Sequence, residues 1–157
     1  MRNSYYKIIM PKLSIIIAAF NSENTLRNAL ESVYTQDFQD WECIVVDGAS
    51  TDKTLDIVNE YVAKDSRFRY ISEPDKGIYD AFNKGWRMAK GEWIHYLGSD
   101  DRIVKDGFKN LFLQDTNADL IGGAVYLVRD DEKDKLQETS LADGCHQAFI
   151  TKRKLFF

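Results

Sequence analysis

Short hydrophobic runs alternate in this chain with segments whose apolar residues recur every three to four positions. The run Leu13–Ala19 is rich in β-branched residues, which predicts a strand buried on both faces. Comparable runs predict strands at Trp41–Asp47, at Phe68–Ser72 and at residues 93–97. Polar residues follow each run, so the pattern indicates strands separated by turns and helices.

Helical spacing fills the intervals between these strands. Two helices are expected to follow residues 21–22 and residues 50–52, which are suited to capping them. A third is expected over residues 78–90 with Gly91 as its C-cap, and a fourth over residues 104–113. The buried positions predicted from the spacing are Leu26, Ala29, Leu30 and Val33 in the first helix, Leu55, Val58 and Val62 in the second, and Ala81, Phe82, Gly85 and Ala89 in the third.

Beyond Ala118 the alternation becomes strand-like again, at residues 120–121 and 125–128. The polar segment 129–143 is expected to be a hairpin loop or a mobile excursion. Strands alternating with amphipathic helices at this spacing predict βαβ units and a mostly parallel sheet flanked by helices. We therefore predict a Rossmann-like α/β fold in a single domain over residues 1–157, with its core at residues 12–128.

The composition is that of one ordinary globular domain, because 44% of the 157 residues are hydrophobic and 29% are charged. A net charge of -4 argues against a nucleic-acid-binding surface. The best apolar run, residues 13–20, is too short for a membrane-spanning helix, which needs about 20 residues. Cys43 and Cys145 match no metal-ligand spacing, and Cys43 is expected to be a buried thiol, so the cytoplasm is the expected compartment.

Polar side chains gather where three of the predicted strands end, and ligands of parallel sheets bind outside such carboxyl ends. The adjacent carboxylates of Asp100 and Asp101 repel each other, and a hard divalent cation such as Mg²⁺ or Mn²⁺ would stabilise them. The alternative is that Asp100 caps the following helix while Asp101 faces water. The gathered residues are Asn21 and Glu23, then Asp47, Ser50 and Asp52, and finally Ser99, Asp100 and Asp101.

Several common motifs of nucleotide-binding and hydrolytic enzymes are missing after these strands. The chain has no phosphate-binding loop ending in Lys-Ser/Thr, no G-x-G-x-x-G turn, no G-x-S-x-G elbow and no zinc-type histidine pair. A nucleotidyltransferase would need a Gly-rich loop with Arg or Lys after the first strand. This chain has Ala-Ala-Phe-Asn there, at residues 18–21.

Four segments, in order and at matching spacing, resemble motifs of family 2 glycosyltransferases, which have the GT-A fold. Residues 13–21 resemble the opening strand of that family, and residues 44–54 resemble the motif of its second strand. Residues 72–85 look like a third motif, typical of the subgroup that builds exopolysaccharides and O-antigens. Residues 91–101 are similar to the metal-binding segment.

The resemblance implies that the chain binds a nucleoside-diphosphate sugar, linked to UDP or GDP, together with Mn²⁺ or Mg²⁺. It implies that Asp47 hydrogen-bonds the base, that Asp100 coordinates the metal, and that Asp101 is a weaker metal ligand. The family often has an aspartate where this chain has Gly98, so one ribose or metal contact is expected to be lost or replaced. The implied donor-binding residues are Ala19, Phe20, Asn21, Glu23, Asp47, Ser50, Asp75, Lys76, Gly77, Asp80, Asn83 and Ser99.

The implied reaction is an inverting, metal-dependent transfer of the sugar to a glycan or lipid-linked acceptor in surface polysaccharide biosynthesis. Such a transfer needs compensation of the charge on the departing diphosphate and a base for the acceptor proton. The family carries that base beyond the metal segment, whereas this sequence stops at Phe157, so we expect a truncated chain that lacks the base. The alternative hypothesis is a nucleotide-sugar-binding module without transferase activity.

Three other residue types receive weaker assignments. His146 is the one candidate to replace the base or to contact the metal, although a structural role is the simpler interpretation of a lone histidine. His95 lies inside a predicted strand and is given no catalytic role. Tyr79 is expected either to stack on a sugar or to pack. The three tryptophans, Trp41, Trp86 and Trp93, are expected to be packing residues.

The C-terminal basic run has two interpretations. Lys152, Arg153 and Lys154 form either a solvated face or a site of peripheral association with the inner face of a membrane. If the acceptor-binding half is absent, the sheet face that it would cover is exposed, which predicts self-association.

Overall fold

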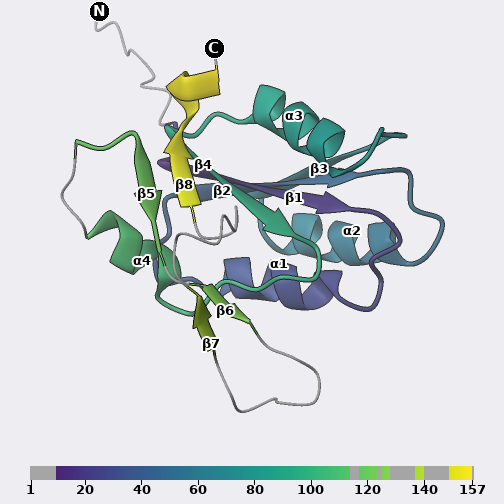
Figure 1. Ribbon diagram of the computed structural model, residues 1–157. Helices are drawn as coiled ribbons and strands as arrows, with labels where there is room; N and C mark the ends of the chain where they lie inside the picture. The colour runs from purple at the N-terminus through teal and green to yellow at the C-terminus, as the bar shows by residue number, and fades with distance from the viewer. Residues whose placement is uncertain (1–9, 114–116, 124, 128–136, 140–148, 157) are drawn as a thin grey trace, which may run out of the picture.

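The computed structural model describes residues 10–113, 117–123, 125–127, 137–139 and 149–156 (Figure 1). The elements, in chain order, are β1 (Leu13–Ala19), α1 (Leu26–Tyr34), β2 (Trp41–Asp47), α2 (Thr54–Lys64), β3 (Phe68–Ser72), α3 (Ile78–Met88), β4 (Trp93–Gly98), α4 (Gly107–Phe112), β5 (Leu120–Gly122), β6 (Val125–Leu127), β7 (Gln137–Thr139), β8 (Phe149–Lys152) and the 3₁₀ helix η3 (Arg153–Phe156).

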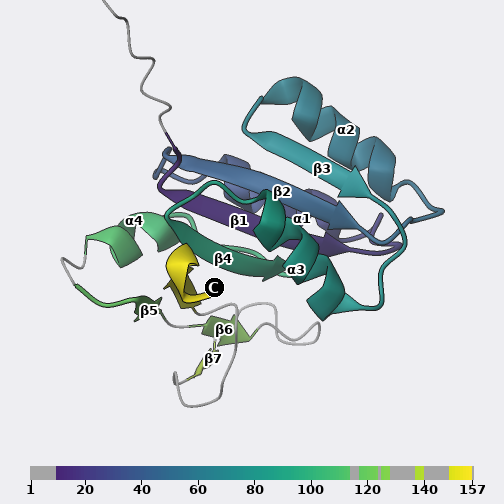
Figure 2. The same cartoon turned by 90° about the horizontal axis from the view of Figure 1, so that it is seen from above.

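In the described part of the chain, the main sheet has the strand order β3-β2-β1-β4-β8-β5 (Figure 2). The first four strands are parallel, and β8 lies antiparallel between β4 and β5. The predicted α/β fold with a mostly parallel sheet is therefore confirmed. The strand predictions for β1, β2 and β3 are confirmed residue for residue, and β4 extends one residue further than predicted.

Helices cover both faces of the sheet, with α1 and α2 on one face and α3 on the other (Figure 1). The central strand β1 is buried on both faces because Ile15 and Ile17 pack toward α1 and α2 while Ile16 packs toward α3. Burying each such side chain contributes about 1.5–3 kcal/mol. The chain crosses from one face of the sheet to the other between β3 and β4.

The prediction for the buried face of α2 was partly wrong. Val58 is buried as expected, but its buried neighbours are Ile57 and Tyr61 instead of Leu55 and Val62. The Tyr61 ring packs edge-on against Phe68, at 5.5 Å between centroids, and its hydroxyl donates to Glu31 Oε2 at 2.7 Å. Because its hydroxyl has a hydrogen-bond partner, the aromatic side chain of Tyr61 can be buried on this face of α2.

Two helix ends also differ from the prediction. α3 stops at Met88, and Gly91 is not its C-cap, because Ala89 is already extended with a ψ of 138°. Gly91 instead lies against β1, where an added Cβ would come within 2.5 Å of the Ser14 backbone nitrogen. α4 begins at Gly107 and not at residue 104, because Gln36 Nε2 donates to the Val104 carbonyl at 2.8 Å and holds that segment outside the helix.

Several other expectations can be checked against the described residues. β6 and β7 pair antiparallel, so residues 137–139, inside the segment predicted to be a loop, form a strand instead, while residues 128–136 and 140–143 lie outside the described part. Cys43 is a buried free thiol, as predicted, and burial raises its pKa. Cys145 and His146 fall outside the described residues. The helices that the structure describes include none with the length and hydrophobicity needed to span a membrane.

The C-terminal basic run has partners within the fold. Lys152 and Lys154 both pair with Asp119 Oδ1, at 3.0 and 2.8 Å. Arg153 Nε donates to the Gly91 carbonyl at 3.0 Å. The basic run is therefore held by contacts within the fold, at and just after β8. Its peripheral association with a membrane stays a prediction.

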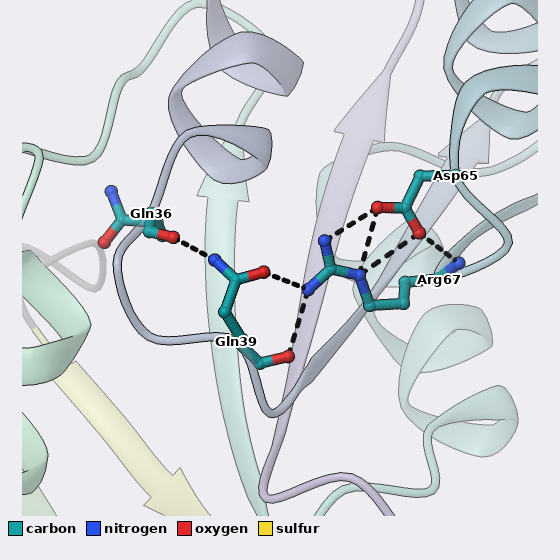
Figure 3. A network of polar contacts seen from close by, with 4 residues as sticks. All are labelled: Gln36, Gln39, Asp65 and Arg67. Atoms are coloured by element: carbon teal, nitrogen blue, oxygen red, sulfur yellow. Dashed lines mark hydrogen bonds and ion pairs between the residues drawn. The ribbon is translucent and has the colours of Figure 1, made fainter.

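A polar cluster around Arg67 joins the loops that precede β2 and β3 (Figure 3). The Arg67 guanidinium donates to both carboxylate oxygens of Asp65, at 2.7 to 3.1 Å, and to the backbone and side-chain oxygens of Gln39, at 3.0 and 2.9 Å. The Gln39 amide donates in turn to the Gln36 carbonyl, and the guanidinium lies 3.8 Å from the centroid of the Trp41 ring. The cluster thus fixes the end of the sheet opposite to the carboxyl ends of the strands.

Asp65 is expected to make the stability of the protein depend on pH. The hydrogen bonds from Arg67 hold the pKa of the Asp65 carboxyl below its usual range. Its contribution is therefore complete above the unfolded pKa, about 3.9, and is lost as the pH falls through the lower folded value. We expect Asp65→Asn to lower the free energy of unfolding by about 1–2 kcal/mol at pH 7, with a smaller deficit at pH 3. Urea denaturation at both pH values measures this difference.

Asp40→Asn is the control, because Asp40 is exposed and its side chain makes no hydrogen bond within the described residues. A deficit for Asp65→Asn that stays constant between pH 7 and pH 3 would contradict the assignment.

Candidate functional site

The strand order creates a topological switch point between β1 and β4. The chain leaves β1 toward α1 on one face of the sheet and enters β4 from α3 on the other face. The strand order therefore reverses between these two strands, and open α/β sheets bind ligands at the carboxyl edge beside such a reversal. The predicted candidate residues after β1, β2, β3 and β4 all belong to this edge of the sheet.

The loops after β1 and β2 are tied together through Asn21. Its backbone N–H donates to Ser50 Oγ at 2.8 Å, and its side-chain oxygen accepts from the Thr51 N–H at 2.9 Å. Asn21 and Ala49 are the non-glycine residues with positive φ, 46° and 64°, in the described chain. Such backbone conformations cost about 1–3 kcal/mol each and cluster at functional sites. The two residues therefore indicate that this edge of the sheet has a functional role.

A second pair of contacts joins the same two loops. The Glu23 N–H donates to Asp52 Oδ2 at 3.0 Å, and Glu23 Oε2 accepts from the Lys53 N–H at 3.0 Å. Asp52 Oδ1 also accepts from the Thr54 N–H at the start of α2. Glu23 and Asp52 therefore hold loops in place.

Asp47, at the end of β2, is completely buried, and both of its oxygens are engaged. Oδ1 accepts from Ser50 Oγ, and Oδ2 accepts from Ser72 Oγ at 2.6 Å and from the Ser50 N–H at 3.1 Å. Its backbone carbonyl accepts from the Glu73 N–H. Because the Asp47 side chain is 0% exposed, the predicted contact with a nucleobase would require the residues around it to move.

Hydroxyl groups connect the end of β1 to the end of β4. Ser22 Oγ lies 2.8 Å from Ser99 Oγ, and the Ser22 N–H donates to Thr54 Oγ1 at 2.7 Å. Sequence reasoning placed Ser99 at this edge but missed the roles of Ser22, Thr54 and Ser72. Serine and threonine after strands are common in turns, so no spacing in the sequence distinguishes these three from ordinary loop residues.

Asp100 and Asp101 differ in their surroundings. The Asp101 carboxylate accepts from the Gly98 N–H at 3.2 Å, and the Asp101 N–H donates back to the Gly98 carbonyl. Asp100 is exposed, and in the described structure its carboxylate takes part in no hydrogen bond or ion pair. The alternative in which Asp100 caps the next helix is wrong, because α4 begins at Gly107 and Asp106 is its N-cap.

Gly98 explains how the two carboxylates fit together. A Cβ at this position would lie 2.5 Å from Asp101 Oδ2 and 2.8 Å from Asp100 Oδ1. The predicted departure from the family pattern therefore opens the space that both carboxylates enter. Among the described residues, no three His, Cys, Asp or Glu side chains form a complete metal-binding group. A cation at Asp100 would need further ligands from water or from a bound phosphate compound.

The loop after β3 presents several of the remaining candidates. Asp75 Oδ1 accepts from the Gly77 N–H at 2.8 Å, and Asp80 Oδ2 accepts from the Lys76 N–H at 3.1 Å. Gly77 precedes α3 with a φ of 108°, a conformation that favours glycine. α3 begins at this edge of the sheet, so the positive end of its dipole lies here. Tyr79 and Asn83 are exposed on α3.

His95 and the three tryptophans behave as predicted. His95 is 3% exposed, its Nδ1 lies 3.0 Å from the Phe149 carbonyl, and its ring packs edge-on against Phe108. Trp41 and Trp93 are buried in the core, and Trp86 is half-buried and packs against it. These contacts give the four residues structural roles.

The family model described as "Glycosyl transferase family 2" matches residues 14–156. The chain is 40% identical over 96 residues to the PGL/p-HBAD biosynthesis glycosyltransferase of Mycobacterium tuberculosis, a match that covers 60% of this chain and 38% of that protein. The chain thus spans well under two thirds of this relative.

Two solved structures share the fold. S. aureus TarS in complex with UDP-GlcNAc is 32% identical, with a TM-score of 0.63 over 69% of this chain and 33% of that chain. The mannosyltransferase PcManGT from Pyrobaculum calidifontis, in complex with GDP-Man and Mn²⁺, superposes with a TM-score of 0.71 over 94% of this chain and 46% of that chain. Its sequence identity of 21% supports the fold alone.

Asp47 and Asp100 should differ sharply in their effects on stability. Asp47→Ala would remove the acceptor of the Ser50 and Ser72 hydroxyls and of the Ser50 N–H and would leave a gap at a buried position, so we expect the free energy of unfolding to fall by about 1–3 kcal/mol. Asp100→Ala removes an exposed carboxylate without partners and should change the same quantity by less than about 0.5 kcal/mol. Urea denaturation of both variants measures the contrast, and equal effects would contradict the assigned environments.

Proposed function

The chain belongs to glycosyl transferase family 2, and on this premise we propose that the carboxyl edge of its sheet binds a nucleoside-diphosphate sugar, linked to UDP or GDP. The observation that carries this proposal is the Asp100 carboxylate, which is exposed and unpaired at the end of β4, beside the switch point. A free carboxylate in that place suits a divalent cation that takes its other ligands from a diphosphate.

The proposed donor site uses residues from four loops. The loops after β1 and β2 are already fixed by their mutual hydrogen bonds, so they would bind a ligand at little entropic cost. The start of α3, with the neighbouring Lys76, would favour the diphosphate through the helix dipole and the lysine charge. The residues that we assign to the donor site are Ala19, Phe20, Asn21, Glu23, Ser50, Asp75, Lys76, Gly77, Asp80, Asn83 and Ser99.

Asp100 would be the protein ligand of Mn²⁺ or Mg²⁺, with Asp101 as the weaker one because Gly98 already engages it. A bound cation would offset the negative charge that develops on the departing diphosphate. PcManGT, whose structure contains Mn²⁺ and GDP-Man, shares the fold of this chain. S. aureus TarS, in complex with UDP-GlcNAc, supports the choice of a nucleotide sugar.

The reaction that we propose is an inverting transfer to a glycan or lipid-linked acceptor in surface polysaccharide biosynthesis, on the cytoplasmic side of a membrane. Inversion requires a base that removes the acceptor proton on the face opposite to the diphosphate. No residue of the described chain is assigned this role, and His146 lies outside the described part. Donor binding without transfer is accordingly the second proposal for this chain by itself.

Metal-dependent nucleotide binding tests the donor site. In calorimetric titrations with UDP and with GDP, we expect one of the two to bind at least about tenfold more tightly with Mn²⁺ than without it, as a charge-assisted contact predicts. Asp100→Ala should lower the affinity in Mn²⁺ to the metal-free value. Asp40→Ala is the matched control, because Asp40 is an exposed aspartate just before the amino end of β2, at the opposite end of that strand from the site. An Asp100→Ala variant with wild-type affinity in Mn²⁺ would contradict the proposal.

A separate measurement distinguishes transfer from binding. The release of UDP or GDP from a donor sugar is followed with and without a glycan acceptor. Release of UDP or GDP that depends on the acceptor supports the transferase. Release that stays at the protein-free rate with and without the acceptor supports the binding function alone.

A further inference from the structure

The nucleobase of the proposed donor needs a hydrogen-bond acceptor that Asp47 does not offer. The Asp47 side chain is 0% exposed, and both of its oxygens already accept hydrogen bonds from Ser50 and Ser72. A base could contact this carboxylate only if the residues that cover it moved aside. Another acceptor at the same edge of the sheet is therefore required.

Gly48, the next residue, marks where that acceptor lies. A Cβ built on Gly48 would come within 2.7 Å of Asp75 Oδ2 and within 3.3 Å of Phe20 Cδ2. A carboxylate from the loop after β3 and an aromatic ring from the loop after β1 thus approach one point above the end of β2. The absence of a side chain at Gly48 leaves room for these two groups to approach each other.

The Asp75 carboxylate is held in place but not saturated. Its Oδ1 accepts from the Gly77 N–H at 2.8 Å, which fixes the orientation of the group. Its Oδ2 is the atom that points to Gly48, and no hydrogen bond to it occurs in the described part of the chain. One oxygen therefore positions the side chain, and the other is available to a ligand.

Phe20 supplies an exposed aromatic face in the same place. Its side chain is 63% exposed, whereas its backbone is held by Ser22, whose Oγ bonds to both the Phe20 carbonyl and the Phe20 N–H. An aromatic ring on an anchored backbone is a suitable stacking surface for a base, and such stacking contributes about 1–3 kcal/mol whichever base is bound.

We propose that Asp75, and not Asp47, recognises the nucleobase of the donor, with Phe20 as the surface on which the base stacks. This inference rests on the proposed function, since it assigns roles within that donor site. A carboxylate accepts but cannot donate, so it favours a ring N–H, which uracil has at N3 and guanine has at N1. Cytosine and adenine carry an acceptor nitrogen at the corresponding ring positions, and the carboxylate would repel it.

The test compares the dissociation constants of UDP, GDP, CDP and ADP, all measured by calorimetry in Mn²⁺. The diphosphate and the metal contacts are common to the four ligands, so the ratios between them isolate recognition of the base. We expect the wild-type protein to bind UDP or GDP roughly 10- to 100-fold more tightly than CDP and ADP, the ordinary range for a hydrogen bond to a charged group.

Asp75→Asn is the decisive variant. The asparagine oxygen can keep the Gly77 contact while its NH₂ group replaces Oδ2, so a donor now faces the base. We expect the preference over CDP and ADP to fall at least tenfold, by weaker binding of UDP or GDP and tighter binding of CDP or ADP. Phe20→Ala should weaken all four ligands by roughly 5- to 100-fold and leave their ratios unchanged. Asp40→Asn is the matched control, because Asp40 is exposed just before the amino end of β2, at the opposite end of that strand from the site.

The outcomes separate the two levels of the proposal. A wild-type protein that binds none of the four nucleotides overturns the donor site and this inference together. A wild-type protein that binds UDP or GDP in preference, with the preference unchanged in a folded Asp75→Asn variant, overturns the role of Asp75 and leaves the donor site standing. The melting temperature of the free Asp75→Asn variant, expected to equal that of the wild type, excludes misfolding as the cause of a changed ratio.

Discussion

The buried Asp47 carboxylate is the constraint on which the proposed site depends. A carboxylate at the end of a fully buried strand is stable only if its oxygens are satisfied, and here Ser50 and Ser72 satisfy them. Because Ser50 also accepts from the Asn21 N–H, one buried group fixes the loops after three adjacent strands. The loops at the binding edge are therefore shaped before any ligand arrives.

The opposite end of the sheet is fixed by a different set of polar contacts. Glu42, 8% exposed, accepts from Ser14 Oγ at 2.6 Å and from the Lys90 N–H, and its other oxygen pairs with Arg69 at 2.8 Å. Together with the cluster around Arg67, these contacts lock the starts of the parallel strands. The ion pairs of Arg67 and Arg69 lie at the amino ends of the strands, while the residues with positive φ and the unpaired Asp100 carboxylate lie at the carboxyl ends.

Exposure separates residues that look alike in the sequence. Asp47, Asp75 and Asp100 each lie at or after the end of a strand, yet both oxygens of the first accept hydrogen bonds, the second has one oxygen without a hydrogen bond, and the third is unpaired within the described residues. Gly48 and Gly98 matter for a related reason, since each leaves room for a carboxylate from elsewhere in the chain. The position of each carboxylate at the carboxyl edge of the sheet therefore depends on the space that these two glycines leave.

The sequence by itself determined the strands, the α/β class and the edge where polar residues gather, because strand burial and helical spacing are local patterns. It placed the ends of β1, β2 and β3 correctly. The tertiary structure alone decided the inner face of α2, the late start of α4 and the different surroundings of the three aspartates. Those features depend on partners far away in the sequence, such as Phe68 for Tyr61, Gln36 for Val104 and Ser72 for Asp47. No periodicity encodes such pairings, since they arise only when the sheet brings separate loops to one edge.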